Sequence, residues 1–356
     1  MTPPIPRPVN LRPTNPRPAN LRQVAKEAGV HPSTASRALN PATRHLVAAP
    51  AAGRVQEAAA RLGYRPDTAA MSLRTGRSRL VGALVPGIAN PVFAPILAAA
   101  AAALAEDGHA LLVADPGDDP ARAAEFVAEL AARRVDGLLL ATVSLRDDPA
   151  LAACLDRGLP TVLINRSGGA GVPAVVSDDR AGMALAVRHL AMLGHRRIAH
   201  VGGPAPLSTG LLRREGFEQA MAAQGLDVPP GWTEAATAYG RAEGEAAAAL
   251  LLARCPGVTA LACANDLLAL GAYDACRRAG LRIPADISVT GHNDMPLVDM
   301  IEPPLTTIRI PHEDMGRRAA RLLLDRIHHG TESGVVVLAP VLVERGSSAP
   351  PRAGNP

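Results

Sequence analysis

Short apolar runs alternate with amphipathic helix patterns along the chain after residue 80, and this alternation restricts the fold more than any other feature. The apolar runs, which we expect to be strands, are Leu80–Val85, Ala110–Ala114, Val135–Ala141, Pro160–Ile164, Ala174–Ser177, Ile198–Val201, Thr259–Ala264, Ile287–Thr290 and Leu305–Ile310. The helix patterns are Ala121–Arg133, Ala181–Leu193, Leu211–Gln224, Arg241–Arg254, Asp266–Ala279 and Met315–His328. Strands that alternate with helices predict parallel sheets covered by helices on both faces.

The length of this alternating segment predicts two sheets. Residues 80–345 exceed what one doubly wound sheet usually accommodates, so we expect two doubly wound subdomains. In open α/β sheets of this kind, ligands bind outside the carboxyl ends of the strands. A small molecule would therefore bind in the cleft between the two subdomains.

Three short helices are predicted ahead of this segment, over residues 20–63. The first, Leu21–Ala28, has Asn20 as a suitable N-cap and Gly29 as its stop, and the second begins at Pro32. The third spans Ala51–Leu62. The residues expected to face a common core are Leu21, Val24, Ala25, Ala28, Ala35, Ala38, Leu39, Val55, Ala58, Ala59 and Leu62.

Three stretches lack the pattern of a folded element. Residues 1–19 carry proline at short intervals and predict an extended, disordered arm. Residues 64–79 form a basic connector with too few apolar residues for a core of its own, and residues 346–356, rich in Pro, Gly and Ser, predict a disordered tail. We therefore expect an arm, a headpiece at 20–63, a hinge, a larger domain at 80–345 and a tail.

Charge is distributed unevenly between these parts. Residues 1–80 hold 13 Lys and Arg against 3 Asp and Glu, whereas the whole chain holds 37 against 33. A basic head on an acidic body suggests that the head meets a polyanion such as nucleic acid. A solvated basic tail explains the same distribution, so charge alone leaves both interpretations open.

Several classes of function find no support in the sequence. The four cysteines, Cys154, Cys255, Cys263 and Cys276, form no Cys-x-x-Cys pair, so we expect buried thiols and neither a metal site nor a cofactor. No catalytic motif of a hydrolase or nucleotide-binding enzyme is present, so we do not expect an enzyme. The proline-rich start is not a secretory signal and no apolar run is long enough to span a membrane, which favours a cytoplasmic protein.

The segment Leu21–Asn40, LRQVAKEAGVHPSTASRALN, resembles the helix-turn-helix of the lactose-repressor/purine-repressor (LacI/GalR) family. The physics of the segment agrees, because Gly29 can supply the positive φ of the tight turn between the two helices. The resemblance implies a DNA-binding transcription regulator. Its implied fold is a small all-α headpiece followed by an α/β, periplasmic-binding-protein-like sensor domain of two doubly wound parallel-sheet subdomains.

The resemblance also implies which residues contact operator DNA: His31, Ser33, Thr34, Ser36, Arg37, Asn40, Tyr64, Met71, Leu73 and Arg74. Arg37 can donate two hydrogen bonds to a guanine, although a contact to phosphate alone is the alternative. Leu73 matches the hinge leucine that wedges into the minor groove, the alternative being an ordinary linker residue. Because Pro32 has neither an amide hydrogen nor a polar side chain, we expect base discrimination to rest on Ser33 and Arg37.

Some positions depart from the family pattern. His31 replaces the usual serine that caps the recognition helix, and Met71 replaces a residue that is often basic. Residues 41–46 form a longer loop than usual, and the third helix begins without the family's Ser-x-x-Thr start. Gly53 weakens that helix by up to ~1 kcal/mol relative to alanine. We therefore expect a marginally stable headpiece.

The resemblance continues through the larger domain to about residue 345 and implies a set of effector-binding residues. These are Asn90, Phe93, Asn165, Arg213, Tyr239, Asn265, Asp266 and Asn293. In the family's arrangement, Phe93 and Tyr239 would stack on the ligand, Arg213 would clamp a pair of oxygens, and the asparagines would bind hydroxyls. Each of these polar residues could instead be a structural loop group. Asp115, Asp118 and Asp119 form an acidic loop that we expect to be solvated.

Two asparagines stand where family members commonly carry aspartate, namely Asn165 and Asn293. Each replacement removes one negative charge, so we predict an anionic effector, such as a sugar acid or phosphorylated sugar, attracted by Arg213. The chain is expected to be a homodimeric, ligand-gated repressor of double-stranded operator DNA. A solute-binding protein shares the two-lobed fold, but the basic headpiece argues against it. The sequence leaves open the effector, the target genes, and activation as against repression.

Overall fold

The computed structural model describes residues 19–40, 43–64, 77–168, 171–331 and 334–352. The chain divides into two compact units, Met1–Ser78 and Arg79–Pro356. We call the first the headpiece and the second the sensor, and we describe each by itself. The predicted arm, most of the predicted hinge and the last four residues lie outside the described residues.

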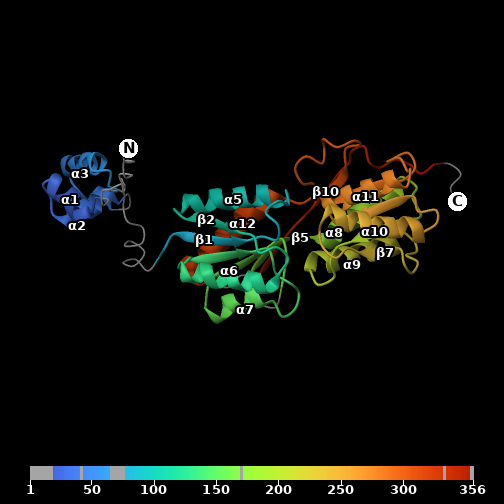
Figure 1. Cartoon of the computed structure of the whole chain (residues 1–356), viewed down its shortest axis with the longest axis horizontal. Helices are drawn as coiled ribbons and strands as arrows, with labels where there is room; N and C mark the ends of the chain where they lie inside the picture. Colours follow the sequence, from blue (N-terminus) through green and yellow to red (C-terminus); the bar gives the residue numbers. More distant parts are fainter. Residues whose placement is uncertain (1–18, 41–42, 65–76, 169–170, 332–333, 353–356) are drawn as a thin grey trace, which may run out of the picture. The chain divides into compact units, whose positions relative to one another are not determined.

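The described residues of the headpiece form three α-helices around a small core (Figure 1). They are α1 (Leu21–Glu27), α2 (Pro32–Leu39) and α3 (Ala49–Arg61), with a 3-10 turn η1 (Arg44–Leu46) before α3. The prediction for Asn20 is confirmed, because its side chain accepts from the Gln23 amide and the Gln23 side chain accepts from the Asn20 amide. Gly29 has a φ of +65°, as the tight turn requires.

Two headpiece residues differ from what the sequence suggested. His31 does not leave α2 uncapped, because its Nδ1 accepts from the Ser33 amide at 3.3 Å and from the Ser33 hydroxyl at 2.8 Å. An imidazole nitrogen thus replaces the serine oxygen as the cap. Leu62 is not a core residue either. Helix α3 ends at Arg61, and Leu62 follows as its C-cap with 38% of its surface exposed.

The sensor contains two six-stranded sheets, as the alternating pattern predicted. The first, in the order β11-β5-β4-β3-β1-β2, is parallel throughout. Its strands are β1 (Leu80–Leu84), β2 (Ala110–Ala114), β3 (Gly137–Leu140), β4 (Thr161–Ile164), β5 (Ala174–Ser177) and β11 (Val335–Leu338). Helices α5 (Phe93–Glu106) and α12 (His312–His329) pack together on one face, and α6 (Pro120–Ala132) packs with α7 (Pro149–Asp156) on the other (Figure 1).

The second sheet has the order β12-β10-β9-β8-β6-β7, and only β12 runs antiparallel to its neighbour. Its strands are β6 (Ile198–Gly202), β7 (Thr233–Ala235), β8 (Ala260–Cys263), β9 (Ser288–Asn293), β10 (Thr306–Arg309) and β12 (Val341–Val343). Helix α8 (Asp179–Met192) packs against α9 (Ser208–Ala223), and α10 (Arg241–Arg254) packs against α11 (Asp266–Arg278). Each sheet with its helices forms one subdomain, here called first and second.

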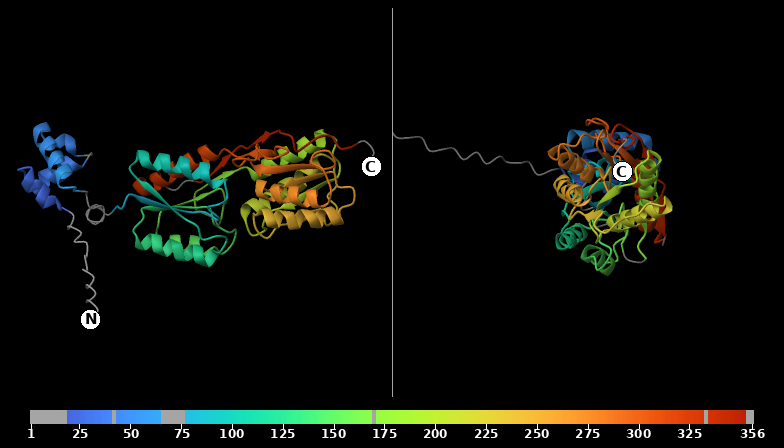
Figure 2. Two further views of the ribbon diagram at one scale, coloured as in Figure 1. Left: turned by 45° about the horizontal axis from the view of Figure 1, so that its top comes forward. Right: turned by 90° about the vertical axis from the view of Figure 1, so that its right-hand side faces the viewer.

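The chain passes between the subdomains after β5, after β10 and between β11 and β12. In Figure 2 the red C-terminal segment accordingly runs along both of them. Two hydrogen bonds also join the two subdomains. The Leu145 amide donates to the Pro206 carbonyl at 2.9 Å, and the Ser167 amide donates to the Ser208 hydroxyl at 2.9 Å. These bonds link the first subdomain to the second in addition to the three chain crossings.

The expectation of a disordered tail was wrong for residues 346–352. Ser347 is fully buried, where its hydroxyl accepts from the Thr306 amide at 2.8 Å and donates to the Val289 carbonyl at 2.6 Å. Ser348 bonds His189 at 2.8 Å. These polar contacts fasten the segment to the second subdomain despite its low hydrophobicity. Among the described residues, no helix combines the length and apolar character needed to cross a membrane.

Candidate functional site

The recognition helix α2 presents two different faces. Ala35 and Ala38 are buried against the headpiece core, whereas Ser33 and Arg37 are exposed on the opposite side. This division follows from the helical period, which separates the apolar positions from the polar ones. Figure 1 shows α2 packed with α1 and α3 in this unit. The helix therefore offers short polar groups and one guanidinium to a partner.

The other residues predicted to contact DNA occupy varied positions. His31 is exposed at the N-cap of α2, while Thr34, Ser36 and Asn40 are half-buried along the helix and at its C-cap. Tyr64 packs against the headpiece core. Met71, Leu73 and Arg74 lie outside the described residues, so the structure gives no account of the predicted minor-groove wedge.

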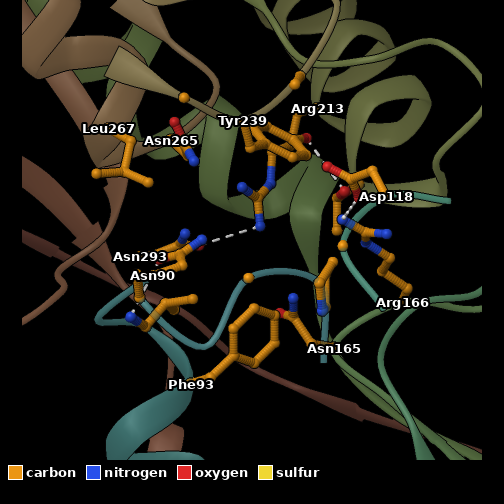
Figure 3. A pocket seen from close by; sticks show the side chains of 18 residues that line it. Asn90, Phe93, Asp118, Asn165, Arg166, Arg213, Tyr239, Asn265, Leu267 and Asn293 are labelled. Atoms are coloured by element: carbon orange, nitrogen blue, oxygen red, sulfur yellow. Dashed lines mark hydrogen bonds and ion pairs between the residues drawn. The ribbon is translucent and has the colours of Figure 1, made fainter. Parts of the chain in front are cut away.

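A cavity of about 310 Å³ lies between the two subdomains of the sensor (Figure 3). Seven of the eight predicted effector residues line it: Asn90, Phe93, Asn165, Arg213, Tyr239, Asn265 and Asn293. Asn165, Asn265 and Asn293 stand at the carboxyl ends of strands β4, β8 and β9 or within two residues of them. The topology thus gathers residues from distant parts of the sequence at the crevice where α/β sheets bind ligands.

Asp266 is the predicted residue that does not line this cavity. Its carboxylate accepts from the Met295 amide at 2.7 Å and from the Thr307 hydroxyl at 2.5 Å, within the second subdomain. Burial raises the pKa of Asp266 to about 7, against the opposing effect of these donors. Asp266 therefore fixes the loop after β9, which carries Asn293 at its start.

Three of the asparagine side chains have their orientation fixed by donors in the protein. The Asn90 oxygen accepts from the Val92 amide at 3.2 Å, and the Asn265 oxygen accepts from the Leu268 amide at 2.7 Å, which also caps α11. The Asn293 oxygen accepts from Arg213 at 3.2 Å. With its oxygen engaged, each amide can offer its NH₂ group, which is a donor only.

Asn165 differs from the other three asparagines. It adopts a left-handed conformation with φ of +64°, which asparagine tolerates better than most residues. Its side-chain oxygen is buried and has no hydrogen-bond partner among the described residues. A buried acceptor without a partner costs free energy, so this oxygen is ready for a donor from a ligand.

Arg213 on α9 is held by three acceptors. Its Nε donates to Asp179 Oδ1 at 2.7 Å, one terminal nitrogen donates to the Ala264 carbonyl at 2.6 Å, and the other donates to Asn293. Arg213 and Asp179 are 2% and 3% exposed, so they form a fully buried ion pair. Burial opposes the charge on Arg213, but Asp179 together with Tyr239 and Asp266 outweighs that effect, and the pKa of Arg213 lies above its ordinary value.

Two neighbouring side chains, Thr209 and Arg213, interact with Tyr239 beside the cavity. Its hydroxyl donates to the Thr209 hydroxyl at 3.1 Å, and its ring lies 6.0 Å from the Arg213 guanidinium carbon. A side chain on Gly203 would overlap the Tyr239 hydroxyl, which explains why glycine stands there. Together with Phe93, Tyr239 supplies aromatic surface to a cavity that is otherwise rich in polar groups (Figure 3).

Arg166 and Asp118 line the cavity, although sequence reasoning missed Arg166 and assigned Asp118 to a solvated loop. Figure 3 shows the two side chains directed toward one another. A terminal nitrogen of Arg166 lies 3.5 Å from Asp118 Oδ1, and the Asp118 side chain is 51% exposed. Arg166 itself is only 4% exposed. The available signal was its position directly after Asn165 at the end of a strand.

The other two aspartates of the acidic loop accept structural hydrogen bonds, although Asp119 is also exposed, as expected. Asp115 accepts from the amides of Gly87, Ile88 and Gly117 at 2.7–2.9 Å. Partial burial opposes its charge, but these three donors hold the pKa of Asp115 below its ordinary value. Asp119 caps α6 by accepting from the Ala121 and Arg122 amides. These bonds shape the loops that carry Asn90 and Asp118 to the cavity.

Comparison with known families and structures agrees with both units. Residues 20–67 match the family model described as bacterial regulatory proteins, lacI family, and residues 187–348 match a periplasmic binding protein-like domain. An uncharacterized HTH-type transcriptional regulator from Streptomyces limosus is 38% identical over 340 residues, covering 92% of this chain and 94% of the relative.

Two of the similar solved structures cover nearly the whole chain. A transcriptional regulator CelR–cellobiose complex has a TM-score of 0.71 and 32% identity, covering 93% of this chain and 100% of the other. The lac repressor dimer bound to operator and an anti-inducer has a TM-score of 0.82 and 29% identity, covering 94% and 100%. The likeness thus includes the headpiece as well as the sensor.

Proposed function

Because the chain belongs to the LacI family of bacterial regulatory proteins, we propose that it is a cytoplasmic repressor that binds a specific operator as a homodimer. Its operator affinity would be controlled by a small sugar, sugar acid or sugar phosphate bound in the sensor. The family's members are DNA-binding transcription regulators. The repressor role, the dimer and the effector class are our proposals for this chain.

The exposed face of α2 carries the DNA-binding proposal. Ser33 and Arg37 project from a helix whose opposite side is buried, so the helix can enter a major groove without disturbing its own core. Arg37 can pair with the O6 and N7 atoms of a guanine through two parallel hydrogen bonds. The His31 cap fixes the first turn, where contacts to bases are made in this kind of motif.

The cavity supports control by a small molecule. Phe93 and Tyr239 offer aromatic surface to a sugar-sized ring, and the asparagines offer directed hydrogen bonds. Because residues from both subdomains line the cavity, a bound ligand would favour one arrangement of the subdomains over another. A coupling of ~1–3 kcal/mol between this site and the headpiece is enough to change operator affinity by one to two orders of magnitude.

Fluorescence anisotropy tests the proposal, with the purified chain titrated against labelled DNA from upstream of its own gene and against genome-selected fragments. We expect tight binding that weakens steeply as salt rises, because Lys and Arg contacts to phosphates release counterions. Arg37→Ala should abolish the preference for the specific fragment. Arg61→Ala is a matched control, because Arg61 is exposed on α3 and pairs with Glu27 of α1. Equal binding of specific and random fragments would contradict the proposal.

A further inference from the structure

The cavity contains one buried arginine from each subdomain, and the two are balanced differently. Arg213 of the second subdomain is paired with Asp179, which is equally buried and 2.7 Å away. Arg166 of the first subdomain is paired only loosely, at 3.5 Å, with a carboxylate that is half exposed. Both arginines line the same cavity. Arg166 is therefore the cation that lacks a full counterion.

A buried charge is costly unless a partner shares its low-dielectric surroundings. Water competes for the exposed Asp118 carboxylate and screens its attraction for Arg166. Burial lowers the pKa of Arg166, and Asp118 opposes that effect while the charge of Arg213 adds to it. An anion placed in the cavity would relieve both the burial of Arg166 and its repulsion from Arg213.

We propose that Arg166 binds an oxyanion, a carboxylate or a phosphate, carried by the effector. The proposal rests on the effector site proposed above and assigns the anion-binding role to Arg166 instead of Arg213. A guanidinium suits such a group, because its planar fork matches two oxygens at once. Arg213, already bonded to three acceptors of the protein, positions Asn293 instead.

The hydrogen-bonding pattern of the cavity agrees with this assignment. Asn90, Asn265 and Asn293 have their oxygens engaged by the protein and can offer donors. A ligand with many acceptor oxygens fits these groups, and an oxyanion accepts without donating. The unpaired oxygen of Asn165, next to Arg166 in the chain, binds a hydroxyl donor of the same ligand. The effector class is therefore a hydroxylated acid or phosphate ester.

The size of the cavity limits the ligand further. At about 310 Å³ it lies at the lower end of the range for small-molecule sites. The cavity in this conformation accommodates one sugar-sized ring with an acidic group better than it accommodates an oligosaccharide. Such a ligand can contact both Arg166 of the first subdomain and the amide donors of the second. The oxyanion would therefore stabilise this arrangement of the two subdomains.

Isothermal titration of the full chain tests the assignment with matched probes: glucose, glucuronate and glucose 6-phosphate, with the ribose and galactose counterparts. We expect one acidic or phosphorylated member to bind at least about 10-fold more tightly than its neutral counterpart, as charge-assisted hydrogen bonds require. Whether the uronate or the phosphate binds more tightly distinguishes the two sources of oxyanion.

Two variants change the charge balance in opposite directions. Arg166→Gln should reduce affinity for the preferred acid by about 10- to 100-fold and remove its advantage over the neutral sugar. Asp118→Asn should tighten binding of the same acid several-fold, because it removes the competing carboxylate. Arg166→Lys should keep part of the preference. The melting temperature of each variant without ligand shows whether the fold is intact.

The outcomes separate this proposal from the proposed function. A panel in which no oxyanion-bearing member binds more tightly than its neutral counterpart overturns the role of Arg166. So does an acid preference that survives Arg166→Gln in a folded protein. Binding of a neutral sugar, with release of operator, would leave the regulator intact while removing the oxyanion. Failure of specific operator binding would overturn the proposed function whichever sugar binds.

Discussion

The headpiece and the sensor bury different kinds of side chains. In the headpiece, the buried core consists of alanines with Val24 and Val55, so no residue larger than valine is fully buried there among the described residues. The sensor buries leucine, isoleucine, phenylalanine and methionine, and it also buries Arg213 and Arg166. The smaller core supplies little stability, because stabilisation scales with the apolar area removed from water. Under the proposed function, the headpiece would act through its surface, whereas the sensor would act through groups held inside it.

The largest effect that would sharpen this contrast is expected from Asp179→Ala. Removing the carboxylate leaves Arg213 as an uncompensated charge that is only 2% exposed. We expect the free energy of unfolding of the sensor to fall by about 3–5 kcal/mol. Trp232 is the single tryptophan of the chain and packs against the sensor core, so its fluorescence during urea unfolding reports this unit alone.

A matched control for that substitution lies on α9, the helix that carries Arg213. Glu218 pairs with Arg214 at 3.6 Å, and both side chains are about half exposed. Because exposed pairs contribute little, Glu218→Ala should change the free energy of unfolding by less than ~1 kcal/mol. Equal effects of the two substitutions would show that the buried pair is not the feature that distinguishes the sensor.

Protonation of His200 should produce the next largest change in the stability of the sensor. Burial lowers the pKa of His200 to about 4, although its hydrogen bond to the Ala262 carbonyl opposes this. Between pH 6.5 and 4, His200 therefore binds a proton in the unfolded chain but not in the folded sensor. Its contribution, up to about 3 kcal/mol, is present at neutral pH and is lost as pH falls through this window.

Urea unfolding followed by Trp232 fluorescence at several pH values measures this dependence. Asp266, with its pKa raised to about 7, binds a proton in the folded state and acts in the opposite sense. Comparison with His200→Gln isolates the histidine, and we expect the variant to lose less stability between pH 6.5 and 4. A slope unchanged by the substitution would refute the assignment. The two described histidines of the headpiece, His31 and His45, are exposed.

Val55→Ala tests the weakness of the headpiece core. The substitution removes two methyl groups from a fully buried side chain and should destabilise the headpiece by about 2 kcal/mol. In so small a core we expect this to unfold a measurable fraction of headpieces. Hydrogen exchange of the amides of α1–α3 should accelerate while that of the sensor stays unchanged. Unaltered exchange in both units would show that the headpiece is more stable than its composition indicates.

Local features, such as helix caps and turns, could be predicted from the sequence more reliably than contacts between residues that are far apart in the chain. The cap at Asn20, the turn at Gly29 and the alternating strands depend on neighbouring residues, so their patterns are visible in the chain itself. The edge strand β11 was missed because it is short and pairs with β5, which lies far earlier in the sequence. The docking of Ser347 was missed for a similar reason, since its partners lie on β9 and β10.

The candidate site shows the same limit. The resemblance identified seven residues that line the cavity, but it could not reveal which arginine is balanced. That balance depends on Asp179 reaching Arg213 and on Asp118 remaining half exposed beside Arg166, and both facts follow from the tertiary fold. Charge counted along the sequence cannot distinguish a buried pair from a loosely paired cation.

The claim that the headpiece binds DNA and the sensor binds the effector is tested most directly with Arg37→Ala. Operator binding and ligand binding are both measured for this variant. Arg37 is exposed on α2, so we expect operator affinity in anisotropy titrations to fall by about 10- to 100-fold, with loss of sequence preference. Binding of the preferred sugar or acid, measured by titration calorimetry on the same preparation, should remain that of the unaltered protein. Unchanged operator affinity, or a parallel loss of ligand binding, would contradict the account.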